Sequence, residues 1–235
     1  MGRVTFEKRK KLDYRVSESY KSLRTNLQFC GAEVKTVSFT SCTPNEGKSS
    51  VCFNLAVSLA ESGKRVILID ADLRKSVLIG RYKAGGVKAG LAHYLVGQKP
   101  FEEIRMQTDI ENMDIIFSGP YVPNPAELLE SEYFGILVEK CRKEYDYTLV
   151  DTPPLGSVID SAIVAGAVDG AVLVIEADAI SYRFVERIKK QLERSDVRIL
   201  GAVLNKVAMD GGKYGYGKYG GYYGKYYGNY GHVKG

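Results

Sequence analysis

Six short hydrophobic segments recur along the chain, each bordered by charged or turn-forming residues. They are rich in Val, Ile and Leu and occupy residues 35–41, 65–70, 113–118, 147–152, 170–177 and 198–205. Their near-continuous hydrophobicity, without strict alternation with polar residues, is typical of strands covered on both faces, as in a parallel sheet. The pattern therefore predicts six strands in a mostly parallel sheet.

Amphipathic segments lie between the strands and predict helices. One spans residues 47–63, and two longer ones span 126–145 and 181–195. A further helix is predicted at 17–29, ahead of the first strand, with Ser17 as its N-cap. Strands that alternate with helices imply right-handed crossovers and helices on both faces of the sheet. The predicted fold is α/β and doubly wound.

Composition and charge narrow the class of protein. The 235 residues carry a formal net charge of +5, and much of the excess lies in the basic residues 8–11 and in the lysines after residue 212. Basic ends suggest contact with an anionic surface, although a solvated charge run is the commoner explanation. The four cysteines show no CxxC spacing, which argues against a zinc site and a disulfide framework. No apolar run is long enough to span a bilayer, so we expect a soluble, cytoplasmic protein.

The C-terminal segment is nearly all glycine, lysine and tyrosine. Such a composition cannot bury enough apolar surface to fold alone, so we expect residues 211–235 to form a flexible tail. It is either a low-complexity adhesive segment or a substrate for modification. Eight of the seventeen tyrosines lie in it: Tyr214, Tyr216, Tyr219, Tyr222, Tyr223, Tyr226, Tyr227 and Tyr230.

The segment CTPNEGKSS, residues 42–50, follows a predicted strand and opens a predicted helix. In that context it predicts a phosphate-binding loop, because backbone N–H groups and the helix N-terminus face a bound anion. Lys48 would neutralise the β- and γ-phosphates, and Ser49 would ligate Mg²⁺. Cys42 stands where the consensus motif has glycine. The predicted nucleotide-binding residues of the loop are Thr43, Pro44, Asn45, Glu46, Gly47, Lys48, Ser49 and Ser50.

Three aspartates end predicted strands at the edge where open α/β sheets bind ligands. Asp70 and Asp72 leave one strand two residues apart, and Asp151 ends another. Together with the loop they predict a site for Mg²⁺ and a nucleotide, with Ser49, Asp72 and Asp151 as metal ligands. Lys48 and the three aspartates are the predicted catalytic residues, although the sequence leaves the division of labour among the acids open. Asn205, after the last strand, either contacts the adenine or caps a turn.

These motifs resemble those of the bacterial tyrosine kinases, in particular the cytoplasmic kinases of capsular and exopolysaccharide synthesis systems. The resemblance covers nearly the whole chain and includes the Walker A, Walker A′ and Walker B motifs, a proline-containing loop and the tyrosine cluster. The matching segments are residues 17–29, 40–50, 67–76, 118–131, 148–154 and 201–207. It implies a P-loop NTPase of the deviant Walker type with an N-terminal basic segment and oligomerisation helix (1–34), a kinase domain (35–210) and the tail (211–235).

The resemblance also implies a function. The chain would transfer the γ-phosphate of ATP, held with Mg²⁺, to tail tyrosines of a neighbouring subunit, and Asp70 would accept the phenolic proton. Glu18, Lys21 and Arg24 resemble the Glu-x-x-Arg-x-x-Arg subunit-contact motif of the family. Lys21 replaces its first arginine and loses the bidentate fork.

Partners follow from the same resemblance. They are further copies of the chain in a ring, a transmembrane polysaccharide co-polymerase as adaptor, and a cognate tyrosine phosphatase; no specific nucleic acid is expected. The adaptor would recruit the kinase to the inner face of the plasma membrane by contacts near residues 77–97, and phosphorylation would regulate polysaccharide synthesis and export.

The main alternative is a deviant-Walker ATPase switch of the partition or septum-site type, without kinase activity. Those ATPases carry a signature lysine at the second position of the loop, where this chain has Thr43. A scaffold that binds nucleotide only to regulate assembly also remains open.

Overall fold

The computed structural model describes residues 2–9 and 11–208, and the predictions for the tail tyrosines lie outside these residues. Its contacts divide the chain into two units, residues 1–205 and 206–235. All described helices and strands belong to the first unit.

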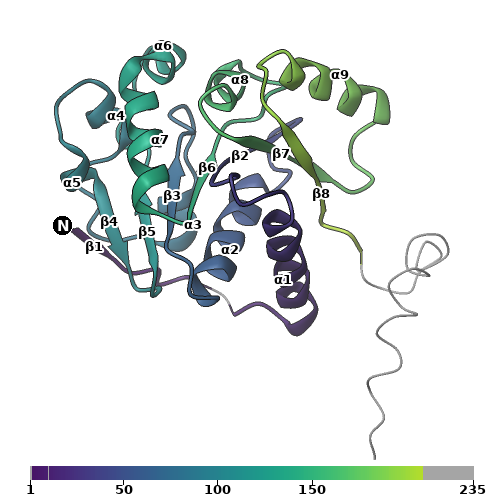
Figure 1. Ribbon diagram of the computed structural model, residues 1–235, viewed down its shortest axis with the longest axis horizontal. Coiled ribbons are helices and arrows are strands. Elements are labelled where there is room, and N and C mark those ends of the chain that lie inside the picture. The colour runs from purple at the N-terminus through teal and green to yellow at the C-terminus, as the bar shows by residue number, and fades with distance from the viewer. Residues whose placement is uncertain (1, 10, 209–235) are drawn as a thin grey trace, which may run out of the picture. The chain divides into compact units, whose positions relative to one another are not determined.

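The first unit is built on one sheet of eight strands in the part of the chain that the structure describes. Along the sheet the order is β1-β4-β5-β3-β6-β2-β7-β8, which can be followed from left to right in Figure 1. The strands are β1 Gly2–Val4, β2 Thr36–Ser41, β3 Val66–Asp70, β4 Arg105–Thr108, β5 Met113–Ile116, β6 Tyr147–Asp151, β7 Gly170–Glu176 and β8 Ile199–Asn205. Every pairing is parallel except that of β4 with β5. The predicted mostly parallel α/β fold is confirmed.

The six predicted strands are all present, but β1 and β4 are additions at one edge. Both are short and carry polar residues, Arg3 in β1 and Gln107 in β4, so their hydrophobic signal is weak. The N-terminal residues nevertheless belong to the core, because Val4 and Phe6 are buried. The Phe6 ring packs edge-on against Phe53, with 5.0 Å between ring centroids.

Nine helices are described. They are α1 Tyr14–Gln28, α2 Lys48–Glu61, α3 Leu78–Tyr82, α4 Leu91–Leu95, α5 Phe101–Ile104, α6 Pro125–Glu130, α7 Glu132–Glu144, α8 Asp160–Ala165 and α9 Tyr182–Glu193. Among the described residues no helix combines the length and the apolar character that crossing a membrane requires.

Two of the predicted helix boundaries are wrong. Ser17 lies inside α1, whose N-cap is Asp13; the Asp13 carboxylate accepts a hydrogen bond from the Val16 amide at 2.9 Å. The predicted helix at 126–145 is two helices, because Ser131 has an extended backbone and its hydroxyl donates to the Leu128 carbonyl.

Both faces of the sheet are covered, as the continuous hydrophobic strands require. In β3, Val66 and Leu68 join a cluster formed with α1 and α2, whereas Ile67 and Ile69 join a cluster formed with α4 to α7. A third cluster lies between β7, α8 and α9. The carboxyl ends of β2, β3 and β6, which are neighbours in the sheet, therefore meet at one protected edge.

Candidate nucleotide-binding site

The candidate site lies where β2, β3 and β6 end. Asp70, the last residue of β3, and Asp151, the last residue of β6, are register partners across the sheet. Helix α2 begins at Lys48, seven residues after β2 ends at Ser41. The topology thus brings the predicted loop and two of the predicted aspartates to the edge at which such sheets bind ligands.

The loop between β2 and α2 is folded by its own glutamate. The buried Glu46 carboxylate accepts hydrogen bonds from the Thr43 amide at 2.9 Å, the Thr43 hydroxyl at 2.7 Å and the Cys42 amide at 3.3 Å. These two amides are thereby engaged within the loop. Glu46 was predicted to bind nucleotide, and the geometry gives it the role of bracing the loop.

Asn205 braces the same loop from the end of β8. Its Nδ2 donates to the Glu46 carbonyl at 2.8 Å. A Cβ at Gly47, which has a φ of +91°, would lie 2.2 Å from that Nδ2, so glycine is needed there for close approach as well as for backbone conformation. The contact favours a structural role for Asn205, and its contact with adenine stays a prediction.

Lys48 lies between two buried aspartates. Its Nζ is 3.5 Å from Asp72 Oδ2, 3.6 Å from Asp151 Oδ1 and 3.3 Å from Ser49 Oγ. Burial, the largest single influence, lowers the pKa of Lys48, but the charges of Asp151, Asp72 and Asp70 together raise it above its ordinary value. The ammonium is therefore firmly protonated and available to a bound polyphosphate.

Asp70 is fully buried beside these groups. Its two carboxylate oxygens accept from the Ser76 hydroxyl and from the Asp72 amide, the latter at 3.3 Å. Burial first, and then the negative charge of Asp151, raise the pKa of Asp70 to about 7, although the Ser76 hydrogen bond opposes the shift. A carboxyl group with this pKa exchanges a proton readily near neutral pH.

Asp151 provides the observation that bears on a metal ion. Its Oδ1 is buried and has no hydrogen-bond partner among the described residues. Burial raises the pKa of Asp151, opposed by Lys48 and Ser49. The described residues contain no cluster of three or more His, Cys, Asp or Glu side chains suited to a metal. Mg²⁺ commonly takes only one or two carboxylates together with phosphates and waters, so the residues present fit it.

Basic side chains that were not predicted complete the pocket. It has a volume of about 240 Å³ and is lined by residues of the loop together with Arg74, Lys75 and Arg81. Arg74 makes a bidentate pair with the buried Asp160, at 2.8 and 2.9 Å, and Arg81 donates to the Ser50 hydroxyl. For Arg74 and Lys75 the sequence held a signal, because both lie within three residues of the predicted ligand Asp72.

The predicted subunit-contact residues lie on α1, away from this pocket's lining. Lys21 Nζ pairs with Glu18 at 2.7 Å on the same helix. Arg24 Nη1 donates to the Ser58 carbonyl of α2 at 2.6 Å. Their intermolecular role therefore stays a prediction, and Arg24 already joins α1 to α2 within one chain.

Comparisons with known proteins place this geometry in context. The family model described as an AAA domain matches residues 34–200. The tyrosine-protein kinase CpsD of Streptococcus agalactiae is 42% identical over 207 residues, which cover 88% of this chain and 90% of the relative.

Solved structures agree with the sequence matches. The kinase domain of the Escherichia coli tyrosine kinase ETK is similar with a TM-score of 0.78 and 33% identity, covering 85% of this chain and 80% of that one. The chimerical protein CapA2B2 is similar with a TM-score of 0.79 and 27% identity, covering 88% of this chain and 94% of that one.

Proposed function

This chain belongs to the bacterial tyrosine kinases, and on that premise we propose that it phosphorylates the tyrosine cluster at residues 214–230 of a second copy. The phosphoryl donor is ATP with Mg²⁺. The modification regulates capsular or exopolysaccharide synthesis and export.

One observation carries the proposal: Lys48 lies within 3.6 Å of both Asp72 and Asp151 at the start of α2. Phosphoryl transfer requires positioned charge more than covalent chemistry, and this cluster supplies a cation for the phosphates and carboxylates for a metal. Outside the tail, the chain offers no comparable concentration of tyrosines.

Each group of residues at the site has its own role in phosphoryl transfer. Lys48 and the loop amides not engaged by Glu46 hold the phosphates. Ser49, Asp72 and Asp151 would hold Mg²⁺, which when bound neutralises phosphate charge. Asp70 accepts the phenolic proton, because its pKa of about 7 makes it the better base near neutral pH, whereas a free tyrosine has a pKa of about 10.

Transfer between copies suits the tail sequence. Glycine on either side of the tyrosines removes steric obstacles to threading an extended segment into another molecule's site. Several acceptors raise the local concentration of substrate without demanding one register. The contact residues Glu18, Lys21 and Arg24 would hold the copies together in a ring.

Partners at the membrane complete the proposal. A transmembrane co-polymerase adaptor would bind near residues 77–97, where Val77 and Val96 are exposed, and would recruit the kinase to the inner face of the plasma membrane. A tyrosine phosphatase would reverse the modification.

A mixing experiment tests the function. Lys48→Met protein with an intact tail is incubated with Mg²⁺, ATP and an active chain whose eight tail tyrosines are phenylalanine. Phosphotyrosine on the Lys48→Met chain, mapped by mass spectrometry, is the expected result and establishes transfer between copies. Release of inorganic phosphate without phosphotyrosine would instead support the ATPase-switch alternative.

A further inference from the structure

A second cleft, of about 800 Å³, lies between α1, the C-terminal half of α2 and residues 9, 11 and 12. It shares no lining residue with the phosphate pocket. Among the residues that the structure describes, its wall contains four basic side chains and one acidic side chain, namely Arg9, Lys11, Lys21, Arg24 and Glu61. The excess of positive charge suits an anionic ligand.

Arg9, Lys11 and Lys21 are only weakly committed elsewhere; Lys21 pairs with Glu18 at 2.7 Å, and both of those side chains are exposed. Arg9 pairs with Glu61 at 2.8 Å, but the two side chains are 39% and 59% exposed, and exposed ion pairs contribute little. Lys11 is exposed and forms no ion pair with any described residue. Arg24 is fixed by the Ser58 carbonyl through Nη1, which orients the guanidinium at the wall of the cleft. An incoming anion can therefore recruit these cations at small cost.

The rest of the cleft is apolar and aromatic. Leu12 and Val57 line it together with Tyr20, whose hydroxyl accepts from Asn54 Nδ2 at 3.4 Å. Burial raises the pKa of Tyr20, so this ring stays neutral and adds no negative charge. A ligand that matches the cleft has a flat apolar body and a strongly anionic head.

We propose that this cleft binds phosphotyrosine from the tail of a second copy of the chain. The inference rests on the proposed function, which supplies the modified tail. The unmodified segment 213–234 carries four lysines and no acidic residue, so a basic cleft repels it. Each phosphorylation adds a charge of about −1.5 to −2 and three acceptor oxygens to an aromatic ring, which converts repulsion into attraction.

The location of the cleft gives the binding a consequence. Lys21 and Arg24 line it and are also two of the three predicted subunit-contact residues. A phosphotyrosine seated there and a neighbouring subunit packed there compete for the same two cations. Phosphorylation of the tail thus replaces direct packing of the copies at this surface with a contact made through the tail.

The test uses a synthetic peptide of residues 218–230, phosphorylated at Tyr222 and Tyr223, with a fluorescent label. The protein is the full chain with its eight tail tyrosines changed to phenylalanine, so that its own tail carries no phosphate. Fluorescence anisotropy at near-physiological salt gives the dissociation constants. The phosphorylated peptide should bind at least about tenfold more tightly than its unmodified counterpart, as expected for charge-assisted contacts.

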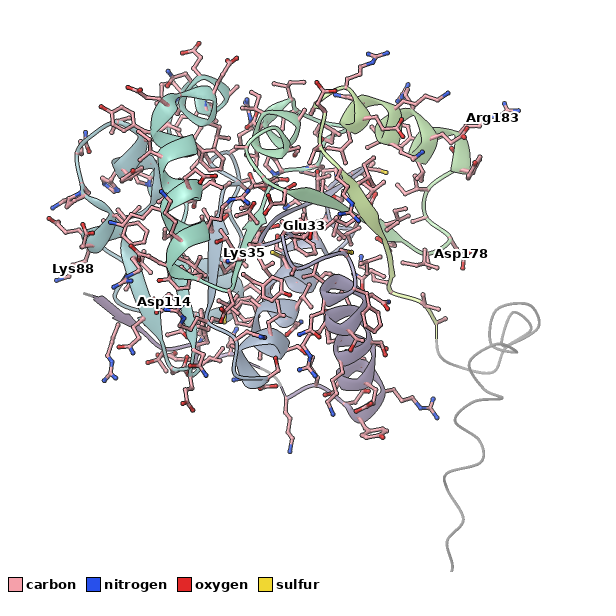
Figure 2. The ribbon with its side chains drawn as sticks, viewed as in Figure 1. Glu33, Lys35, Lys88, Asp114, Asp178 and Arg183 are labelled. Carbon is pink, nitrogen blue, oxygen red and sulfur yellow. The ribbon has the colours of Figure 1, made fainter. Side chains whose placement is uncertain are left out.

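Charge-reversal variants locate the binding. Arg9→Glu combined with Lys11→Glu should weaken binding of the phosphopeptide by at least about tenfold. Neither residue belongs to the nucleotide pocket, so affinity for an ATP analogue should be unchanged and serves as the check of folding. Lys88→Glu and Arg183→Glu are matched controls; Figure 2 shows both side chains projecting outward from segments other than α1.

Three results would overturn the inference. The first is equal affinity of the protein for the phosphorylated and unmodified peptides, and the second is equal affinity of the double variant and the Lys88→Glu control for the phosphopeptide. The third is binding through Arg9 and Lys11 to phosphatidylglycerol vesicles without binding to the phosphopeptide. The peptide is phosphorylated chemically, so the outcome does not depend on kinase activity. Failure of the proposed kinase function would appear only in the mixing experiment.

Discussion

Replacing Asp70 with asparagine should remove a pH dependence from the stability of the nucleotide-free protein. The pKa of Asp70 rises from 3.8 to about 7 on folding. The folded chain therefore holds this proton more tightly than the unfolded chain. The stabilisation is fully present below about pH 4 and is lost as the pH rises through about 7.

The size of the effect follows from the shift. About three pKa units at about 1.4 kcal/mol each give a ceiling of roughly 4 kcal/mol for an isolated group. Asp70 shares its shift with Asp151 and Asp72, so we expect about 2 kcal/mol. Asparagine resembles the neutral acid, because its amide group can face the Ser76 hydroxyl while its oxygen accepts from the Asp72 amide.

Urea unfolding without nucleotide or Mg²⁺ measures the effect. As the pH rises from about 5 to about 8.5, the unmodified chain should lose about 2 kcal/mol more of its free energy of unfolding than Asp70→Asn does. Asp178→Asn, at an exposed aspartate labelled in Figure 2, gives the background. A difference between Asp70→Asn and the unmodified chain that stays constant with pH, or that changes in the opposite direction, would refute the reasoning.

Three further substitutions test the contacts around the site and the N-terminal strand. Gly156→Ala places a Cβ 2.1 Å from the Cys42 carbonyl oxygen; the backbone of the phosphate loop must shift, which should cost about 1–3 kcal/mol of stability and weaken ATP binding measured by calorimetry. Arg74→Ala leaves the buried Asp160 carboxylate without its bidentate partner; allowing for the partial exposure of Arg74, we expect a loss of roughly 2 kcal/mol in urea unfolding. Phe6→Ala empties a buried aromatic position and should lower the free energy of unfolding by about 3–5 kcal/mol.

Matched variants make these outcomes decisive. Gly135→Ala, where no atom lies within 4 Å of the added Cβ, should leave ATP affinity unchanged. Adding Asp160→Asn to Arg74→Ala should recover much of the lost free energy of unfolding, because it removes the buried charge that Arg74 no longer balances. Phe29→Ala, at a residue that is 81% exposed, should have little effect, and a comparable loss there would contradict the assignment of Phe6 to the core.

The sequence predicts well both the sheet and the meeting of the loop with the aspartates at one edge, because both depend on local pattern. Hydrophobic runs identify the central strands, and aspartates at the ends of parallel strands must meet at one edge. The proximity of Asp70, Asp151 and Lys48 follows from topology before any side chain is placed.

Other parts of the site depend on contacts between distant residues and leave no local signal. Asn205 bonds to Glu46 across 159 positions, and Arg74 pairs with Asp160 across 86. The Glu46 side chain could equally have faced the nucleotide, and only the folded loop shows that it accepts hydrogen bonds from the loop's own amides.

The hydrogen bond from Asn205 to the Glu46 carbonyl has a practical consequence for experiments that shorten the chain. Asn205 is the last residue of β8, and the second unit begins at the next position. A deletion that removes Asn205 therefore takes away the hydrogen bond that braces the loop between β2 and α2, together with the tyrosines that we propose as acceptors. Loss of phosphorylation in such a shortened protein could not be attributed to the tail, because the loop would have changed as well. Changing the tail tyrosines to phenylalanine keeps the hydrogen bond from Asn205 to Glu46.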